Sequence, residues 1–211
     1  MRRAPITALL LLAFSFAPRT SLAQAPAPSK TIPDDAFGEK LHLPGVPNAG
    51  KISAVLFRGA QPHANGFAEL KKLGVTTVVD LRGPFMAKLD WERKEVQAQG
   101  MRFVSIPVSG WSPPTDPELV QFLSLMRDEP QQKVFVHCHY GDDRTGVFVA
   151  AYRVTHDHWS SDQAIKEMYY FGFHGFWHPS MESFLRDLLS HMRKEPTFKP
   201  FVTDTAVASS P

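Results

Sequence analysis

The sequence predicts an α/β domain in which a central, mostly parallel sheet is flanked by helices and followed by a helical C-terminal half. Two observations indicate this fold class. Runs of β-branched and aromatic residues alternate with amphipathic segments in the middle of the chain, and only helical patterns follow them. The chain has 211 residues, of which 43% are hydrophobic, so we expect one domain with a substantial core.

Four segments have the composition of strands. They are rich in valine, isoleucine, threonine and phenylalanine, which favour an extended and buried backbone. The expected strands are residues 52–59 (ISAVLFRG), 75–82 (VTTVVDLR), 101–108 (MRFVSIPV) and 133–138 (KVFVHC). At the end of the second of these strands, we expect Asp80 and Arg82 to form a structural ion pair.

Six further segments have the patterns of helices, with apolar residues three and four positions apart. Ser160 and Gln163 have the spacing of a capping box, in which each side chain binds a backbone N–H of the other residue. The expected helices cover residues 66–73 and 87–99, a segment with Leu119, Val120, Leu123 and Met126 inward, a segment from Thr145 through Val154, a segment that begins at Ser160, and residues 180–193.

The two ends of the chain differ in composition from the middle. Residues 1–23 begin with two arginines near the N-terminus, continue with an apolar stretch and end in a Ser-Leu-Ala cleavage site, which is the pattern of a secretory signal peptide. The apolar stretch is too short for a membrane span. We therefore expect a periplasmic or secreted protein with a linker or extended lead-in over 24–50, a domain over 51–194 and a disordered tail over 195–211.

The charge balance argues against polyanionic partners. The full chain has 23 basic and 21 acidic residues, and cleavage after Ala23 would remove three arginines and no acid. The mature chain would then be nearly neutral, so we expect no nucleic-acid partner and no stable membrane insertion. The sequence does not define the oligomeric state.

The only cysteine, Cys138, lies in the stretch VHCHYGDDRTG, residues 136–146, between an expected strand and an expected helix. It has no partner for an internal disulfide, so it is either a buried small hydrophobe or a reactive thiol. The backbone N–H groups of such a turn form an anion nest, the helix start adds partial positive charge, and Arg144 can grip two phosphate oxygens. Gly141 supplies the backbone freedom of a tight loop. We expect a thiolate beneath an oxyanion cradle, which suits phosphoryl transfer through a phosphocysteine.

Residues 137–146, HCHYGDDRTG, resemble the His-Cys-x5-Arg-Ser/Thr-Gly signature of the cysteine-dependent protein tyrosine phosphatases. The stretches LFRGAQPHANGFAELKKLGVTTVVDLR and IPVSGWSPPTDPELVQFL resemble the dual-specificity-like branch found in bacteria, fungi and plants. The resemblance covers about residues 52–190. It implies a phosphomonoester hydrolase, a tyrosine or dual-specificity protein phosphatase, that needs no metal or organic cofactor.

The resemblance also implies a role for each residue of the signature. Cys138 is the nucleophile, Arg144 binds the phosphate, and Thr145 hydrogen-bonds the thiolate. His137 orders the loop and favours the thiolate, unless it is a satisfied core histidine. Backbone amides from His139 to Arg144 complete the cradle, which includes Tyr140, Gly141, Asp142 and Asp143. His139 and Tyr140 are expected at the pocket mouth as specificity or plain surface residues, and Asp142 is expected to be exposed.

The general acid has two candidates. The loop SGWSPPTDPE, before the signature strand, contains Asp116, which is either the acid or the N-cap of the following helix. Asp143 is the second candidate, because similar Asp-Arg-Thr endings occur in bacterial and lipid-directed members of the superfamily. Its alternative role is to orient Arg144 or the loop amides.

Other functions stay open at this point. A catalytically weak phosphate-binding module and a phosphatase of inositol phosphates or phosphoinositides are the main alternatives; a rhodanese-like sulfurtransferase and a metal site at His137, Cys138 and His139 fit less well. Two aspartates near the mouth disfavour highly phosphorylated inositols. Basic residues such as Arg58, Lys88 or Arg153 could offset them.

Overall fold

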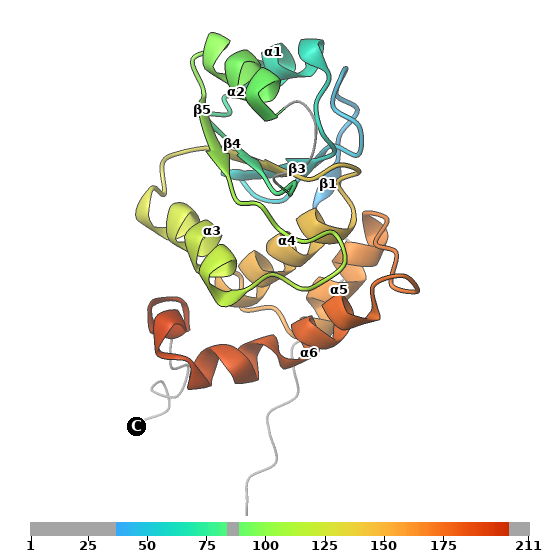
Figure 1. The fold of residues 1–211 in the computed structure, drawn as a ribbon, viewed down its shortest axis with the longest axis vertical. Coiled ribbons are helices and arrows are strands. Elements are labelled where there is room, and N and C mark those ends of the chain that lie inside the picture. Colours follow the sequence, from blue (N-terminus) through green and yellow to red (C-terminus); the bar gives the residue numbers. More distant parts are fainter. Residues whose placement is uncertain (1–36, 84–88, 203–211) are drawn as a thin grey trace, which may run out of the picture. The chain divides into compact units, whose positions relative to one another are not determined.

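The computed structural model describes residues 37–83 and 89–202 (Figure 1). The expected signal peptide, the first part of the lead-in and the end of the tail lie outside the described residues. So does Lys88. Within the described ranges, no helix combines the length and the apolar character that crossing a membrane requires.

The strands form one sheet in the order β1-β2-β3-β6-β4-β5. Its parallel part consists of β3 (Leu56–Gly59), β6 (Val134–His137), β4 (Thr77–Asp80) and β5 (Arg102–Ser105). β6 lies between β3 and β4, and His137 at its end is level with Gly59 and Asp80. The mostly parallel sheet predicted from the sequence is confirmed, and Cys138 follows its central strand.

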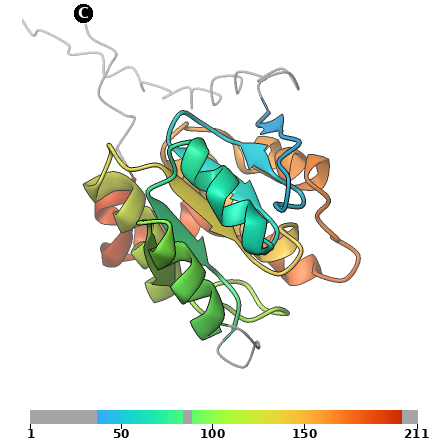
Figure 2. The ribbon, with the colours of Figure 1, turned by 90° about the horizontal axis from the view of Figure 1, so that it is seen from above.

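Helices cover both faces of this sheet. Figures 1 and 2 show α1 (Ala64–Lys72) and α2 (Leu89–Ala98) on one face. The other face carries α3 (Asp116–Asp128), α4 (Asp143–Thr155), α5 (Ser161–Tyr170) and α6 (Pro179–Lys194). The helical C-terminal half is thus confirmed. The Ser160–Gln163 capping box is confirmed as well.

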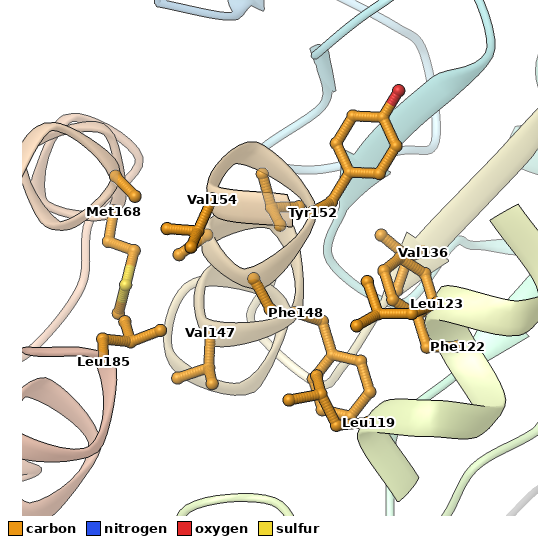
Figure 3. Close-up of a cluster of buried hydrophobic side chains, with 14 of the residues drawn as sticks. Leu119, Phe122, Leu123, Val136, Val147, Phe148, Tyr152, Val154, Met168 and Leu185 are labelled. Carbon is orange, nitrogen blue, oxygen red and sulfur yellow. The ribbon is translucent and has the colours of Figure 1, made fainter. Parts of the chain in front are cut away.

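The core on this second face is built around α4. Figure 3 shows α4 between side chains of α3 on one side and of α5 and α6 on the other. Phe148 meets Phe122 edge-on, with ring centroids 5.3 Å apart, and Met168 and Leu185 pack on the opposite side. Almost every residue of α4 is buried. Close packing of this kind fixes the helix and therefore the position of its N-terminus next to Cys138.

Two expectations about the ends of the domain are wrong for the part that is described. Residues 37–50 do not form an extended lead-in, because β1 (Glu39–Lys40) and β2 (Gly50–Lys51) add antiparallel strands beside β3. Beyond residue 195, the 3-10 helix Pro196–Phe201 buries Phe198 completely. Strands of two residues and a single apolar anchor are too short to produce a periodic pattern in the sequence.

Candidate active site

Cys138 lies at the junction between β6 and α4, at the start of a loop that we call the cysteine loop (residues 138–144). Its side chain is buried, and its Sγ accepts the N–H of Gly141 at 3.3 Å. Asp142 is the N-cap of α4, and its Oδ1 accepts the N–H of Asp143 at 2.8 Å. The helix therefore begins at Asp143, two residues before the position expected from the sequence. Its positive end lies beside the thiol, which favours an anion there.

The carbonyl groups of the cysteine loop are bound from the side of β3. The carbonyl of Gly141 accepts from Arg58 Nη2 and from Asn48 Nδ2 at 3.1 Å, and that of His139 accepts from the Gln61 N–H at 3.2 Å. In a trans peptide the C=O and the following N–H point in opposite directions. The N–H groups that follow these two carbonyls are consequently turned away from β3, as an anion cradle requires.

Gly141 cannot be replaced by a residue with a side chain without moving the loop. Its φ is +75°, in the left-handed region that glycine tolerates best. A Cβ at this position would lie 2.4 Å from both the carbonyl carbon and the oxygen of Gly59. The loop therefore rests directly on the end of β3, and the role predicted for Gly141 agrees with this geometry.

A cavity of about 630 Å³ opens above the loop, and both Cys138 and Arg144 line it. Trp111 and His178 lie on its other side. Arg144 is half-buried, and among the residues that the structure describes it makes no hydrogen bond or ion pair. Its guanidinium is thus available to an anion that enters the cavity above the thiol.

His139 and Tyr140 lie between this cavity and a second one. The second cavity, of about 720 Å³, is lined in addition by Gln61, His63, Arg82, Trp91 and residues near them. The two rings of His139 and Tyr140 meet edge-on at 4.3 Å, and Tyr140 is 68% exposed. The structure therefore places both side chains at the mouth of the cavity, as the sequence predicts.

His137 belongs to a buried charged network that the sequence shows only in part. Its Nδ1 lies 3.0 Å from the carbonyl oxygen of Cys138, and its Nε2 lies 2.6 Å from Glu92 Oε1. Arg82 contacts Glu92 and binds both carboxylate oxygens of Asp80 at 2.7–3.1 Å. The predicted Asp80–Arg82 pair is confirmed. Burial opposes ionisation of Asp80, but the hydrogen bonds from Arg82 hold its pKa below the ordinary value.

The same network favours the charged form of His137. Burial alone would lower the pKa of His137, but Glu92 outweighs it, with help from Asp80, and raises the pKa above its ordinary value. The imidazolium can then donate to Glu92 on one side and to the Cys138 carbonyl on the other. His137 is thus a buried histidine with a partner at each ring nitrogen, as the core alternative predicts, and it ties the cysteine to α2. Its effect on the thiolate stays a prediction.

We predict that this histidine makes stability depend on pH. The folded state binds the proton more tightly than the unfolded chain does, so the stabilisation is complete below the unfolded pKa of 6.5 and is lost as pH rises through the raised folded value. Glu92→Gln should destabilise the protein by roughly 3 kcal/mol at low pH and flatten this dependence. Urea unfolding at several pH values measures both effects. Glu129→Gln, which breaks an exposed pair with Arg102, is the control; equal pH slopes in wild type and Glu92→Gln would contradict the prediction.

Thr145 does not make the predicted hydrogen bond to the thiol in this structure. It is buried, and its Oγ1 has no hydrogen-bond partner among the described residues. The Gly141 N–H contacts the sulfur instead. The support of the thiolate by Thr145 therefore stays a prediction from the family resemblance.

The two candidate acids lie in different surroundings. Asp116 is the first residue of α3, where Thr115 is the N-cap, so the expectation that Asp116 is the N-cap is wrong. The Asp116 carboxylate lies 2.8 Å from His191 Nε2 on α6, and Asp116 does not line the cavity above the cysteine loop. Asp143 does line that cavity. The structure thus brings Asp143, and not Asp116, together with Cys138 and Arg144.

The segment before α6 holds the two aspartates of the cysteine loop. Asp143 Oδ1 accepts the N–H of His174 at 2.9 Å, and its Oδ2 lies 3.3 Å from His178 Nε2. Asp142 Oδ2 lies 3.3 Å from His174 Nδ1. Asp142 is only 7% exposed, so the expectation of an exposed residue is wrong, because the N-cap position turns its carboxylate inward.

Within residues 37–83 and 89–202, two groups of side chains have the donor atoms of a metal site. The first, Asp80, Glu92 and His137, encloses the guanidinium of Arg82, which binds both carboxylates. The second is Asp142, Asp143 and His174, whose carboxylates already accept backbone N–H groups. His137, Cys138 and His139 do not form such a group, since His137 points to Glu92 and Cys138 lines the cavity.

Sequence reasoning missed several residues that support the loop. Glu92 had a usable signal: it lies one helical turn before the buried Val96 and therefore on the inner face of α2. Asn48 and Arg58 had no such signal, because nothing in the sequence distinguishes them from ordinary turn and strand residues. His174 and His178 belong to a segment rich in aromatic residues, of which Phe171 and Phe173 are buried and Phe176 and Trp177 exposed. That composition gives no sign that the two histidines lie beside Asp142 and Asp143.

Comparison with known proteins places the chain in a family. A family model described as "DSP-PTPase phosphatase fused to NAD+ Kinase" matches residues 47–183. The chain is 33% identical over 127 residues to the dual specificity protein phosphatase TpbA of Pseudomonas aeruginosa, a match that covers 60% of this chain and 55% of TpbA. The chain thus spans little more than half the length of this curated relative.

Solved structures of TpbA have the same fold. The crystal structure of P. aeruginosa TpbA gives a TM-score of 0.61 at 27% identity and covers 72% of this chain and 91% of that chain. A TpbA variant in complex with pTyr gives 0.61 at 26% identity, with 72% and 90% covered. The fold is the one seen in these phosphatase structures. The chain belongs to the DSP-PTPase family.

Proposed function

We propose that this protein hydrolyses phosphomonoesters through a phosphocysteine at Cys138 and acts on phosphotyrosine or, more broadly, on phosphoproteins. One observation carries the proposal: an unengaged arginine, Arg144, shares a cavity with a buried thiol whose loop turns N–H groups away from the sheet. The complex of the related TpbA with pTyr supports the choice of substrate.

The geometry suggests the following course of reaction. The Cys138 thiolate attacks phosphorus while Arg144 and the loop N–H groups bind the non-bridging oxygens, whose charge they stabilise in the transition state. The bond to the leaving oxygen breaks, and that oxygen takes a proton from the general acid. Water then attacks the phosphocysteine, transfers a proton to the same acid, now a base, and releases phosphate and the thiolate.

The first experiment is hydrolysis of p-nitrophenyl phosphate and of phosphotyrosine, phosphoserine and phosphothreonine peptides, with acid quenching and mass spectrometry of the cysteine-containing peptide. A phosphoryl group trapped on Cys138 establishes the mechanism. Binding of phosphate analogues without turnover of any ester would instead support the phosphate-binding module.

We propose Asp143 as the general acid, because it is the candidate that lines the cavity beside Cys138. Asp143→Asn should lower kcat by about 100-fold and remove the fall in rate at high pH, since the protonated acid would no longer be required. Asp116→Asn should leave the shape of the pH profile unchanged. Steady-state kinetics across pH tests this; a profile that loses its basic limb only in Asp116→Asn would contradict the assignment.

The charges around the cavity favour phosphoproteins over highly phosphorylated inositols. Asp142 and Asp143 lie in the loop, and among the described residues His174 and His178 are the basic side chains within ion-pair distance of them. Two of the basic residues that could have offset them do not reach the mouth: Arg58 is fully buried, and Arg153 is buried against Glu167. Equal rates on an inositol polyphosphate and on a phosphotyrosine peptide would argue for the inositol alternative.

We also propose that the protein is exported and acts in the periplasm or outside the cell. The proposal rests on the sequence of residues 1–23 alone, with its arginines, short apolar stretch and small-residue cleavage site. N-terminal sequencing of the mature protein, together with cell fractionation, tests it. A cytoplasmic protein that begins at Met1 would overturn it.

A further inference from the structure

Arg58, on β3, is fully buried beneath the cysteine loop. Its Nη2 donates to the carbonyl of Gly141, which is its only hydrogen bond among the described residues. Its Nε and Nη1 are buried without a partner, and its guanidinium lies 4.1 Å from the centre of the Phe171 ring. A stacked and fixed arginine that leaves two nitrogens unsatisfied is costly, which calls for a reason in the function.

The other buried arginines are neutralised by carboxylates. Arg82 binds Asp80 and Glu92, and Arg153 binds Glu167 and Asp157. No described carboxylate lies within ion-pair distance of Arg58. A buried charge without a partner costs several kcal/mol of folding free energy. If packing alone mattered at position 58, an apolar residue would be more stable there than arginine.

The anion best placed to balance Arg58 is the Cys138 thiolate. Burial lowers the pKa of Arg58 to about 10, although the negative charges of Cys138, Glu167 and Asp142 act to raise it. The guanidinium therefore stays charged at neutral pH. Glu167 is already bound by Arg153 and by the N–H of Gly38.

The other buried charges near the thiol are already engaged. Asp142 accepts the Asp143 N–H and lies beside His174. Arg82 also attracts the thiolate, from the side of β4, but it is held between two carboxylates. Among the buried arginines, Arg58 is therefore the one near Cys138 whose charge is not already balanced by an acid.

We propose that Arg58 is a positioning residue for the phosphatase reaction: it holds the Gly141 carbonyl away from the cavity, and its buried charge favours the thiolate form of Cys138. The proposal builds on the phosphocysteine mechanism above. In this reaction Arg58 forms no bond to the substrate and neither gives nor takes a proton. Its two actions reinforce each other, because the same guanidinium that orients the loop also acts on the sulfur beneath it.

Two substitutions separate the charge from the hydrogen bond. Arg58→Lys and Arg58→Gln can both donate to the Gly141 carbonyl, but only lysine keeps the positive charge. Cys138 is the only cysteine in the chain, so the rate of alkylation by iodoacetamide reports on its thiolate directly. This readout needs no turnover. Thermal unfolding of each variant, measured beside it, shows that the folded protein is the species being alkylated.

The pH of half-maximal alkylation should rise by about one unit in Arg58→Gln and stay near the wild-type value in Arg58→Lys. The acidic limb of kcat/KM for p-nitrophenyl phosphate should move in the same direction. Arg153→Lys, a conservative change at a buried arginine that has carboxylate partners, is the control and should not move the midpoint. If Arg58→Gln does not fold, Arg58→Met and the lysine variant are compared in the same way.

Identical alkylation midpoints in wild type, Arg58→Lys and Arg58→Gln would overturn the proposal. An equal upward shift in both variants would also overturn the role of the charge, since geometry alone would then explain it. Absence of phosphatase activity in the wild type would refute the proposed function, whereas the alkylation midpoints would still decide whether Arg58 favours the thiolate.

Discussion

Cys138→Ser is expected to abolish turnover, with a loss in kcat of at least about 100,000-fold. A serine hydroxyl in the same cradle is a far weaker nucleophile than a thiolate, and the covalent intermediate cannot form at a useful rate. The fold should survive, because serine has nearly the size of cysteine and the sulfur makes only one hydrogen bond, to Gly141. Burst kinetics with p-nitrophenyl phosphate and mass spectrometry of the quenched enzyme measure the loss.

The same variant should still bind substrate, because Arg144 and the loop N–H groups remain in place. A phosphotyrosine peptide should therefore be retained by Cys138→Ser, and the unphosphorylated peptide should not. Val136→Ile, a small change in the preceding strand, is the packing control and should keep most of the activity. A Cys138→Ser protein with one per cent or more of wild-type kcat would show that another group is the nucleophile.

The part of the site that lies in one continuous stretch could be predicted from the sequence. A buried strand, a glycine-containing turn and an amphipathic helix follow one another within residues 133–155, so Cys138, Gly141 and Arg144 are placed by local structure alone. The same holds for the parallel strands, whose β-branched runs are long enough to recognise. Local patterns are reliable here because the backbone that joins these residues leaves few alternatives.

The support of the loop could not be predicted, because it comes from distant parts of the chain. Arg58 and Asn48 reach Gly141 across 83 and 93 residues, and Glu92 reaches His137 from another helix. In the sequence, a buried charged residue in a short strand looks the same as a solvent-exposed one, and only the three-dimensional structure distinguishes them. Only the packing of β3 and α2 against β6 distinguishes these residues from ordinary polar ones.

The choice of general acid depends on the residue at which α3 begins. If α3 began after Asp116, the loop that carries this aspartate could extend toward the cavity. Thr115 is the N-cap instead, and Glu118 accepts its N–H at 2.6 Å, so Asp116 belongs to the helix and faces His191 of α6. The Thr-x-x-Glu spacing at 115–118 is visible in the sequence and is the signal that would have excluded Asp116 as the cap.

Arg144→Lys is expected to lower kcat/KM by about 1,000-fold or more, although it preserves the charge. Lysine is a point charge and cannot replace the two parallel N–H bonds that a guanidinium makes to phosphate oxygens. Because Arg144 makes no hydrogen bond or ion pair with the described residues, the change should cost little stability, and the loss should fall on the transition state. Kinetics with p-nitrophenyl phosphate, together with thermal unfolding, separate the two effects.

The control for Arg144→Lys is Arg127→Lys, at an exposed arginine that pairs with Asp128 on α3 and does not line the cavity above the cysteine loop. It should leave both kcat/KM and the unfolding temperature nearly unchanged. A large fall in stability in Arg144→Lys would mean that the guanidinium holds the loop in the absence of substrate. In that case, the contacts of Arg58 and Asn48 would not be sufficient to hold the cysteine loop. Arg58 and Arg144 would then both support the loop, and the separate roles proposed for them would be wrong.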